Sequence, residues 1–225
     1  MIKFPAIFLL LSGGNTQIIL ASKLGQYHIL GQTLDDAVGE ALDKCCRLIS
    51  TEWASSGSMG PTLEKLARTG QIIDEFNPTS RLLNPLDFSF SGLKTAFQTF
   101  IDAKKSSYRI GDLAATVQHR IFQHILDRVE NACKLLTKNC INIDRMYLIG
   151  GVAANVELRR ALEQTLRSHE MSLVAAELPY CVDNATMIAE LARSIRLEKE
   201  NRPCYGGVRP DWNVECLSNK PYHIL

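Results

Sequence analysis

Residues 9–20, LLLSGGNTQIIL, place Ser12, Gly13, Gly14 and Asn15 between two apolar runs. Apolar runs joined by a Gly-Gly pair are typical of a β-hairpin, because glycine adopts the tight turns that reverse the chain. Glycine also lets a ligand approach the backbone amides, so the same pair is compatible with an anion-binding turn. The motif alone leaves both interpretations open, and both require a strand on each side of it.

The first third of the chain is predicted to form a β-meander followed by a helix. Its three predicted strands, joined by short turns that contain glycine, cover residues 7–11, 16–21 and 27–30. In residues 33–50, TLDDAVGEALDKCCRLIS, apolar residues recur at steps of three and four, which predicts an amphipathic helix. Asp35 or Asp36 is expected to cap its start, because a side-chain oxygen there accepts a hydrogen bond from a free backbone amide.

Two further helices are predicted in the middle of the chain. Pro61 is expected to open a short helix that Gly70 ends. Residues 71–88 are expected to be mostly loop. Residues 112–138 carry the longest apolar stripe, with the spacing of a helix packed against a core.

Strands and helices alternate in the last third. The expected elements are a strand, a helix, a second strand and a second helix, over residues 145–151, 155–169, 172–178 and 184–200. Helices of this length between strands imply crossover connections and a partly parallel sheet. The sequence therefore predicts an α/β fold, with a mixed sheet, an N-terminal β-meander, crossover helices and an irregular tail over residues 201–225.

Composition and charge are those of an ordinary globular protein. The 225 residues are 46% hydrophobic and carry a net charge of +1, so nucleic acid can be bound only through a local patch. Seven scattered cysteines without a C-x-x-C pair favour reduced thiols in a cytosol-like compartment. The apolar run that follows Lys3 is too short for a membrane span and is expected to be a strand rather than a signal peptide. A solvated face is the expected role of the helical arginines Arg159, Arg160, Arg193 and Arg196.

Three acidic residues share one face of the first predicted helix. Asp36, Glu40 and Asp43 are spaced by four and three positions, so their carboxylates lie on the side opposite the apolar stripe. There they can hold a hydrated cation or accept hydrogen bonds from ribose hydroxyls. The alternative is a solvated face on which Glu40 pairs with Lys44.

A second Gly-Gly pair stands where a predicted strand gives way to a helix, in residues 148–155, LIGGVAAN. Such glycines allow a nucleotide to lie against the backbone, and Asn155 offers both a donor and an acceptor. Alternatively, Gly150 and Gly151 only tighten the turn, and Asn155 is a helix cap. No G-x-G-x-x-G or G-x-x-x-x-G-K-[ST] motif occurs, so dinucleotide and P-loop sites are not supported.

Asp183, in residues 181–190, CVDNATMIAE, is either a metal ligand or a helix cap. One aspartate cannot hold a metal alone. His119 and His124 are five positions apart, which is wrong for a shared helical face, and no H-E-x-x-H motif occurs. All five histidines are therefore expected to be core or surface residues.

Six motifs, taken in order along the chain, resemble the TsaD family, the tRNA adenosine threonylcarbamoyltransferases of bacteria and mitochondria, formerly called the Gcp glycoprotease family. The motifs are LLLSGGNTQ, GQTLDDAVGEALDK, GPTLEKLA, FSFSGLKTA, GGVAANVELR and CVDNATMIA, within residues 9–189. The resemblance implies an ASKHA fold, the actin-like architecture in which two ribonuclease-H-like lobes enclose a nucleotide. It also implies transfer of a threonylcarbamoyl group from threonylcarbamoyl-AMP to N6 of the adenosine 3′ of the anticodon, in tRNAs that read ANN codons.

The resemblance also implies ligands and partners. A divalent metal, Fe or Zn, would act as a Lewis acid beside the carbamoyl carbonyl, and ATP is an alternative nucleotide. Expected partners are tRNA and either TsaB and TsaE type proteins or a second copy, in the cytoplasm or the mitochondrial matrix, without a membrane. No side chain is assigned a catalytic role. By motif, the acyl-adenylate loop is Leu10, Leu11, Ser12, Gly13 and Gly14, the nucleotide contacts are Asp43, Gly60 and Asn155, and the metal ligand is Asp183.

The sequence departs from the bacterial family pattern in three places, one of which is Asn15, a position that is usually histidine in bacterial members and asparagine in archaeal and eukaryotic ones. Family members carry a first phosphate loop and an H-x-x-x-H pair of metal ligands before the Ser-Gly-Gly hairpin, whereas this sequence begins at the hairpin. Residues 1–200 are thus expected to comprise mainly the second lobe. Residues 55–61, SSGSMGP, replace a Tyr-Pro-Gly-Gly-Pro loop, which bears on Gly60. The alternative function is a catalytically inactive lobe that binds nucleotide or serves as a scaffold.

Overall fold

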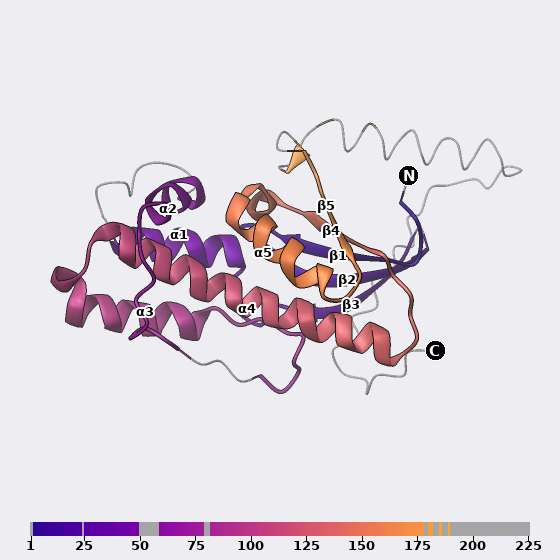
Figure 1. The fold of residues 1–225 in the computed structure, drawn as a ribbon, viewed down its shortest axis with the longest axis horizontal. Coiled ribbons are helices and arrows are strands. Elements are labelled where there is room, and N and C mark those ends of the chain that lie inside the picture. The colour runs from indigo at the N-terminus through magenta and orange to yellow at the C-terminus, as the bar shows by residue number, and fades with distance from the viewer. Residues whose placement is uncertain are drawn as a thin grey trace, which may run out of the picture.

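The computed structural model describes residues 2–23, 25–49, 59–78, 82–177 and 180–181, together with residues 185 and 189. The strands of this part form one mixed sheet in the order β3-β2-β1-β4-β5 (Figure 1). Their bounds are β1 (Ala6–Leu11), β2 (Thr16–Lys23), β3 (Gln26–Gln32), β4 (Arg145–Ile149) and β5 (Ser172–Ala175).

The first three strands form the antiparallel meander that the sequence predicts. β1 pairs with β2 from Ala6 opposite Ala21 to Leu11 opposite Thr16, and β2 pairs with β3. Ile7 and Leu9 on β1 are completely buried. Apolar and β-branched side chains of this kind favour a strand because they pack well on a pleated surface.

β4 and β5 extend the sheet on the other side of β1, and both are parallel to it. Leu10 pairs with Ile149, and Leu148 pairs with Ala175. The predicted crossover connections are therefore confirmed, although β5 ends three residues before the predicted strand does. The carboxyl ends of β1, β4 and β5 consequently lie at the same edge of the sheet.

Helices form in the three predicted segments between residues 33 and 138 and in the predicted segment 155–169, and the structure adds one helix that the sequence does not predict. α3 follows directly after the FSF motif, in a region for which no helix is expected. The helices are α1 (Val38–Ile49), α2 (Gly60–Ala67), α3 (Ser91–Lys104), α4 (Ile110–Lys138) and α5 (Val156–Arg167), with short 3-10 turns η2 (Lys105–Ser107) and η3 (Gly151–Ala154).

α4 is the longest helix in the described part of the chain. It has 29 residues and runs the length of the molecule, from the end that carries α1, α2 and α3 to the end that carries the sheet (Figure 1). Leu113, Val117, Ile121 and Ile125 on its apolar stripe are completely buried. α4 contacts α1, α2 and α5, so one helix supports every helix that borders the carboxyl edge of the sheet.

The start of α1 corrects one prediction. Neither Asp35 nor Asp36 caps this helix. The amide of Val38 donates instead to Oγ1 of Thr16, at 2.8 Å, from the first residue of β2. Thr16 is completely buried, so a long-range contact replaces the local cap that the sequence predicts.

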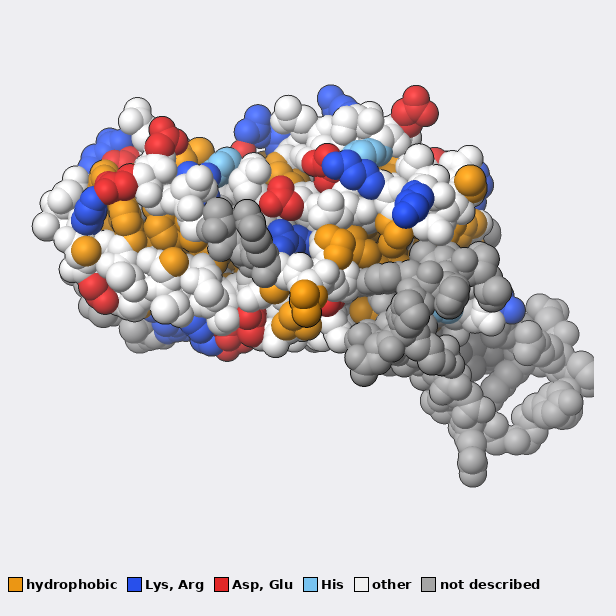
Figure 2. Space-filling view, turned by 90° about the horizontal axis from the view of Figure 1, so that it is seen from below, with side chains coloured by type: hydrophobic (Ala, Val, Ile, Leu, Met, Phe, Trp, Pro, Cys, Tyr) orange, Lys and Arg blue, Asp and Glu red, His pale blue; other side chains and the backbone are white. Residues whose placement is uncertain are grey.

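The mixed sheet, with its N-terminal meander and crossover helices, has the predicted α/β fold class. No helix in the described residues is long and apolar enough to span a bilayer. On the face seen in Figure 2, basic, acidic and apolar side chains are interspersed. The predicted helix over residues 184–200 and the tail over 201–225 lie outside the described residues, and the division at residue 200 stays a prediction.

Candidate functional site

Ser12, Gly13, Gly14 and Asn15 form a hairpin turn at the carboxyl end of β1. The amide of Ser12 donates to the carbonyl of Asn15 at 2.8 Å. Oγ of Ser12 accepts hydrogen bonds from the amides of Gly14 and Asn15, at 3.3 and 2.9 Å. The hairpin that the sequence predicts is confirmed, and the Ser12 hydroxyl already satisfies two of its amides.

The two glycines of this turn are open to the surroundings. A Cβ atom added to Gly13 or to Gly14 would meet no atom within 4 Å. Neither residue has a positive φ angle, so the turn does not require glycine for its backbone conformation. What the glycines provide is an exposed backbone that a ligand can approach.

The start of α1 is seated directly on this turn. The amide of Gly39 donates to the carbonyl of Ser12 at 3.1 Å. A Cβ on Gly39 would lie 2.9 Å from backbone atoms of Ser12 and Gly13, so only glycine permits this approach. The amino-terminal end of a helix is electropositive, and here it lies beside the predicted acyl-adenylate loop.

The charged face of α1 and the segment before it are occupied by ion pairs. Lys44 contacts Glu40 at 2.7 Å and Asp36 at 2.9 Å, and Lys94 from α3 contacts Asp36 at 2.5 Å. Partial burial opposes ionisation of Asp36, but the hydrogen bonds from Lys94 and Lys44 prevail and lower its pKa. Glu40 thus pairs with Lys44, as the alternative interpretation expects, and Asp36 links α1 to α3.

Asp43 has a different role from these two acids. Its Oδ1 accepts a hydrogen bond from the amide of Met59 at 2.9 Å. Met59 is completely buried and directly precedes Gly60, the first residue of α2. Two of the predicted nucleotide contacts, Asp43 and Gly60, are therefore brought together through one backbone group.

Gly150 turns the chain at the carboxyl end of β4. Its φ angle is +95°, and a Cβ there would lie 2.3 Å from the carbonyl oxygen of Leu11. Both observations require glycine at this position. The turn leads into η3, which therefore lies against the end of β1 and the Ser12 hairpin.

Asn155 caps α5. Its Oδ1 accepts from the amide of Leu158 at 3.0 Å, and its Nδ2 donates to Oε1 of Gln118 on α4 at 3.3 Å. The side chain is about nine-tenths buried. The capping role that the sequence left open is confirmed, and the nucleotide contact stays a prediction.

Glu64 on α2 completes the arrangement, although the sequence does not single it out. Its Oε1 accepts from the amide of Val156, the first residue of α5, at 3.3 Å. These contacts connect the elements in a closed ring. The Ser12 hairpin contacts α1, and α1 contacts the start of α2. In turn α2 contacts α5, and the turn before α5 contacts the end of β1, which leads into the hairpin. The predicted substrate-binding residues lie on the elements that this ring joins, and two members of the ring, the Ser12 hairpin and the turn at Gly150, stand at the carboxyl ends of β1 and β4.

The FSFSG motif is held beside this ring by Asp35. The Asp35 carboxylate accepts from the hydroxyls of Ser89 and Ser91, both at 2.6 Å, and from the amide of Phe90 at 2.8 Å. Burial opposes its ionisation, but the two serine hydroxyls and the amides lower its pKa. Asp35 therefore anchors the start of α3. Its pairing with the two serines could not be predicted from the sequence alone.

His124 on α4 lies beneath the same motif. Its Nε2 accepts from the amide of Ser89 at 3.2 Å, and its ring packs against Phe88 and Phe90. Burial, together with the nearby charge of Arg128, lowers the pKa of His124 to about 4. It is a neutral core histidine, as the sequence predicts.

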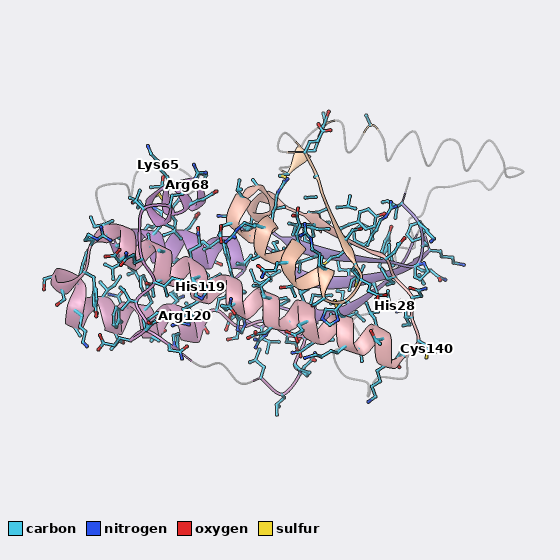
Figure 3. All side chains as sticks on the ribbon, in the orientation of Figure 1. His28, Lys65, Arg68, His119, Arg120 and Cys140 are labelled. Carbon is cyan, nitrogen blue, oxygen red and sulfur yellow. The ribbon has the colours of Figure 1, made fainter. Side chains whose placement is uncertain are left out.

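No metal-binding cluster is found among the described residues, where no three His, Cys, Asp or Glu side chains gather closely enough. Figure 3 shows His28 at the sheet end of the molecule and His119 near the middle of α4, far from each other. Asp183 lies outside the described residues, so its predicted metal ligation stays a prediction.

Two hollows on the described surface lie away from the ring. They have volumes of 220 and 530 Å³ and lie between the carboxyl-terminal half of α4 and the segment around Pro85. None of the predicted site residues lines either of these two hollows.

Comparison with known proteins identifies the family. A family model described as tRNA N6-adenosine threonylcarbamoyltransferase (TsaD) matches residues 1–190. The chain belongs to the TsaD family. A relative of that name from Gluconobacter oxydans is 38% identical over 99% of this chain, and one from Dictyoglomus turgidum is 39% identical over 83%.

The chain is shorter than these TsaD relatives. It spans 62% of the length of the Gluconobacter protein and 54% of the Dictyoglomus protein. Among solved structures, the activator of 2-hydroxyisocaproyl-CoA dehydratase from Clostridium difficile, with bound ADPNP, aligns with 92% of this chain and 67% of its own, at a TM-score of 0.43 and 13% identity.

Proposed function

We propose that this chain takes part in the transfer of a threonylcarbamoyl group from threonylcarbamoyl-AMP to N6 of the adenosine 3′ of the anticodon in tRNAs that read ANN codons. The family supports the reaction class. The observation that supports the proposal is the ring of contacts, which joins the elements that carry the predicted substrate-binding residues of four family motifs. In α/β sheets, ligands bind at the carboxyl ends of the strands.

We propose separate tasks for the parts of the ring. Leu10 and Leu11 end β1 and support the turn, while the open backbone of Gly13 and Gly14 receives the acyl-phosphate group. Asp43 holds the amide of Met59 with one oxygen, and its second oxygen is suited to a ribose hydroxyl. The electropositive start of α1 favours the phosphate charge at this position.

The family resemblance also implies a divalent metal, Fe or Zn, but the residues of the described part do not form a site that fits it. The tasks proposed for the ring residues do not involve the metal, which enters the proposal only through Asp183. The tRNA, the acyl-adenylate, and TsaB and TsaE type proteins or a second copy are proposed partners on the strength of the family alone, as is a cytoplasmic or mitochondrial location.

Transfer of labelled threonylcarbamoyl from threonylcarbamoyl-AMP to unmodified tRNA tests the proposal. We expect transfer by the wild type, at least tenfold less by Asp183→Ala, and unchanged transfer by Asp144→Ala, an exposed aspartate away from the ring. Equal transfer by the two variants would overturn the role of Asp183. Binding of the acyl-adenylate without transfer would favour the scaffold alternative.

A further inference from the structure

Arg159 and Arg160 stand side by side in α5 but differ in their surroundings. Arg160 is exposed and pairs with Glu157, one turn away, at 2.6 Å. A solvated face, the role predicted for both arginines, describes Arg160 correctly. It is wrong for Arg159, which is half-buried and turned towards the sheet edge.

The guanidinium of Arg159 bonds to two separate loops. Its Nε donates to the carbonyl of Ala153 in η3. Its Nη2 donates to the carbonyl of Ala176 at 2.8 Å and to Sγ of Cys181 at 3.3 Å. One side chain therefore ties the loop that follows β4 to the segment that follows β5.

Cys181 strengthens the second half of this connection. The residue is 3% exposed, and its Sγ lies 3.6 Å from the carbonyl oxygens of both Ala176 and Glu177, which share its single S–H donor. The amide of Tyr180 donates to the carbonyl of Glu177 at 2.8 Å. Ala176 is thus shared by the arginine and the thiol, so loss of Arg159 would leave a carbonyl and a sulfur without their cationic donor.

The two connected loops occupy a position that matters for binding. β4 and β5 are neighbouring parallel strands, so η3 and Ala176 both follow carboxyl ends at the edge where the ring lies. We propose that Arg159 is a positioning residue that fixes these two loops in one arrangement, and that the affinity of the candidate site for nucleotide depends on it. The second clause rests on the proposed function, and the first does not.

A ligand contact explains the geometry of Arg159 less well. Its bonds run to a carbonyl in η3, a carbonyl after β5 and a thiol, all within the chain. Two of these bonds share Nη2 and the third uses Nε, an arrangement that needs the planar fork of arginine. Lysine carries all its donors on a single nitrogen and cannot reproduce the separate Nε and Nη2 contacts.

Thiol labelling tests the connection without any ligand. The rate at which Cys181 reacts with N-ethylmaleimide is measured by peptide mass spectrometry in the wild type, Arg159→Ala, Arg159→Lys and the matched control Arg160→Ala. Cys45 and Cys133 serve as internal references for global opening, because burial raises the pKa of Cys45 to about 12 and that of Cys133 to about 11.

We expect Arg159→Ala to raise the labelling of Cys181 at least tenfold over Cys45 and Cys133, Arg159→Lys to raise it by a smaller factor, and Arg160→Ala to leave it unchanged. Unchanged labelling in Arg159→Ala, or an equal rise at all three cysteines, would overturn the connection. In unlabelled protein, the Kd of threonylcarbamoyl-AMP should rise about tenfold in Arg159→Ala and stay unchanged in Arg160→Ala.

The two readouts separate the possible failures. Faster labelling of Cys181 in Arg159→Ala with an unchanged Kd would overturn the positioning role and leave Arg159 a structural residue. A wild type that binds no acyl-adenylate would overturn the proposed function, while the labelling would still decide whether Arg159 joins the loops.

Discussion

Gly13-Gly14 and Gly150-Gly151, two Gly-Gly pairs in the described part of the chain, have different surroundings. Gly150 has a positive φ angle and lies against the carbonyl of Leu11, where no side chain fits. Gly13 and Gly14 have ordinary φ angles and open space around them. The fold therefore requires glycine at position 150, whereas the described fold does not require it at positions 13 and 14.

This difference assigns a folding role to Gly150 and a proposed binding role to Gly13 and Gly14, although both pairs border the same candidate site. Both pairs end a strand of the same sheet, Gly13 and Gly14 after β1 and Gly150 after β4. Since the hairpin is not strained, the fold does not account for its two glycines, and the proposed function assigns their open backbone to the ligand. Substitutions at the two pairs should therefore differ in kind as well as in size.

The largest expected effect is that of Gly150→Ala. Strain at a positive φ angle and the contact with the Leu11 carbonyl should together lower the free energy of unfolding by about 4 kcal/mol. Urea denaturation measures the loss. The matched control is Gly151→Ala, since that position is open, and an equal loss in both variants would break the comparison.

Lowering the pH should cause the next largest loss of stability. The pKa of buried His124 is about 4 in the folded chain and near 6.5 when unfolded, so the unfolded state binds the proton more readily. The free energy of unfolding should therefore fall as the pH drops from 6.5 to 4, by about 3 kcal/mol. Denaturation at several pH values checks this slope in the wild type, and a slope that persists in His124→Gln would contradict the assignment.

Substitution of Asn155, near Gly150-Gly151, should destabilise the fold more than substitution of Asn15, next to Gly13-Gly14. Asn155→Ala removes the cap of α5 and the partner of Gln118, which should destabilise the fold by about 2 kcal/mol. Asn155→Ser keeps a capping oxygen and should recover part of the loss. Asn15 is exposed, so Asn15→Ala should change the melting temperature far less; comparable shifts would show that Asn155 is not the cap that its geometry indicates.

The smallest effect on stability is expected at the open pair. Gly13→Ala and Gly14→Ala should each change the free energy of unfolding by less than about 0.5 kcal/mol. The same variants should weaken the binding of threonylcarbamoyl-AMP about tenfold, or roughly 1.4 kcal/mol, because the new methyl group stands where the ligand approaches. Calorimetry measures the affinity, and full affinity in both variants would leave the open glycines without a binding role.

The strands and most helices of this fold could be predicted because their signals are local. Alternating and continuous apolar runs identify β1 and β2, and steps of three and four identify α1 and α4. The start of α3 has no local cap, so its sequence did not resemble a helix start. Asp35, distant in the sequence, supplies the missing acceptors.

The residues of the candidate site were predicted better than their connections. Motifs named Asp43 and Asn155, but nothing in the sequence relates Glu64 to Val156 or Arg159 to Cys181. Glu64 and Val156 are 92 positions apart, and the carboxylate could equally have been a surface charge. Contacts of this range depend on how the helices pack, which periodicity does not specify.

The hydrogen bonds that Asp35 accepts at the start of α3, called the Asp35 clamp below, affect the order in which the chain folds. Its partners Ser89, Phe90 and Ser91 lie 54 to 56 positions further along the chain, so a long loop must close before the first hydrogen bond forms. The start of α3 is therefore expected to become ordered late, after the meander and α4 have assembled around it. Loss of the clamp should then accelerate unfolding far more than it slows refolding.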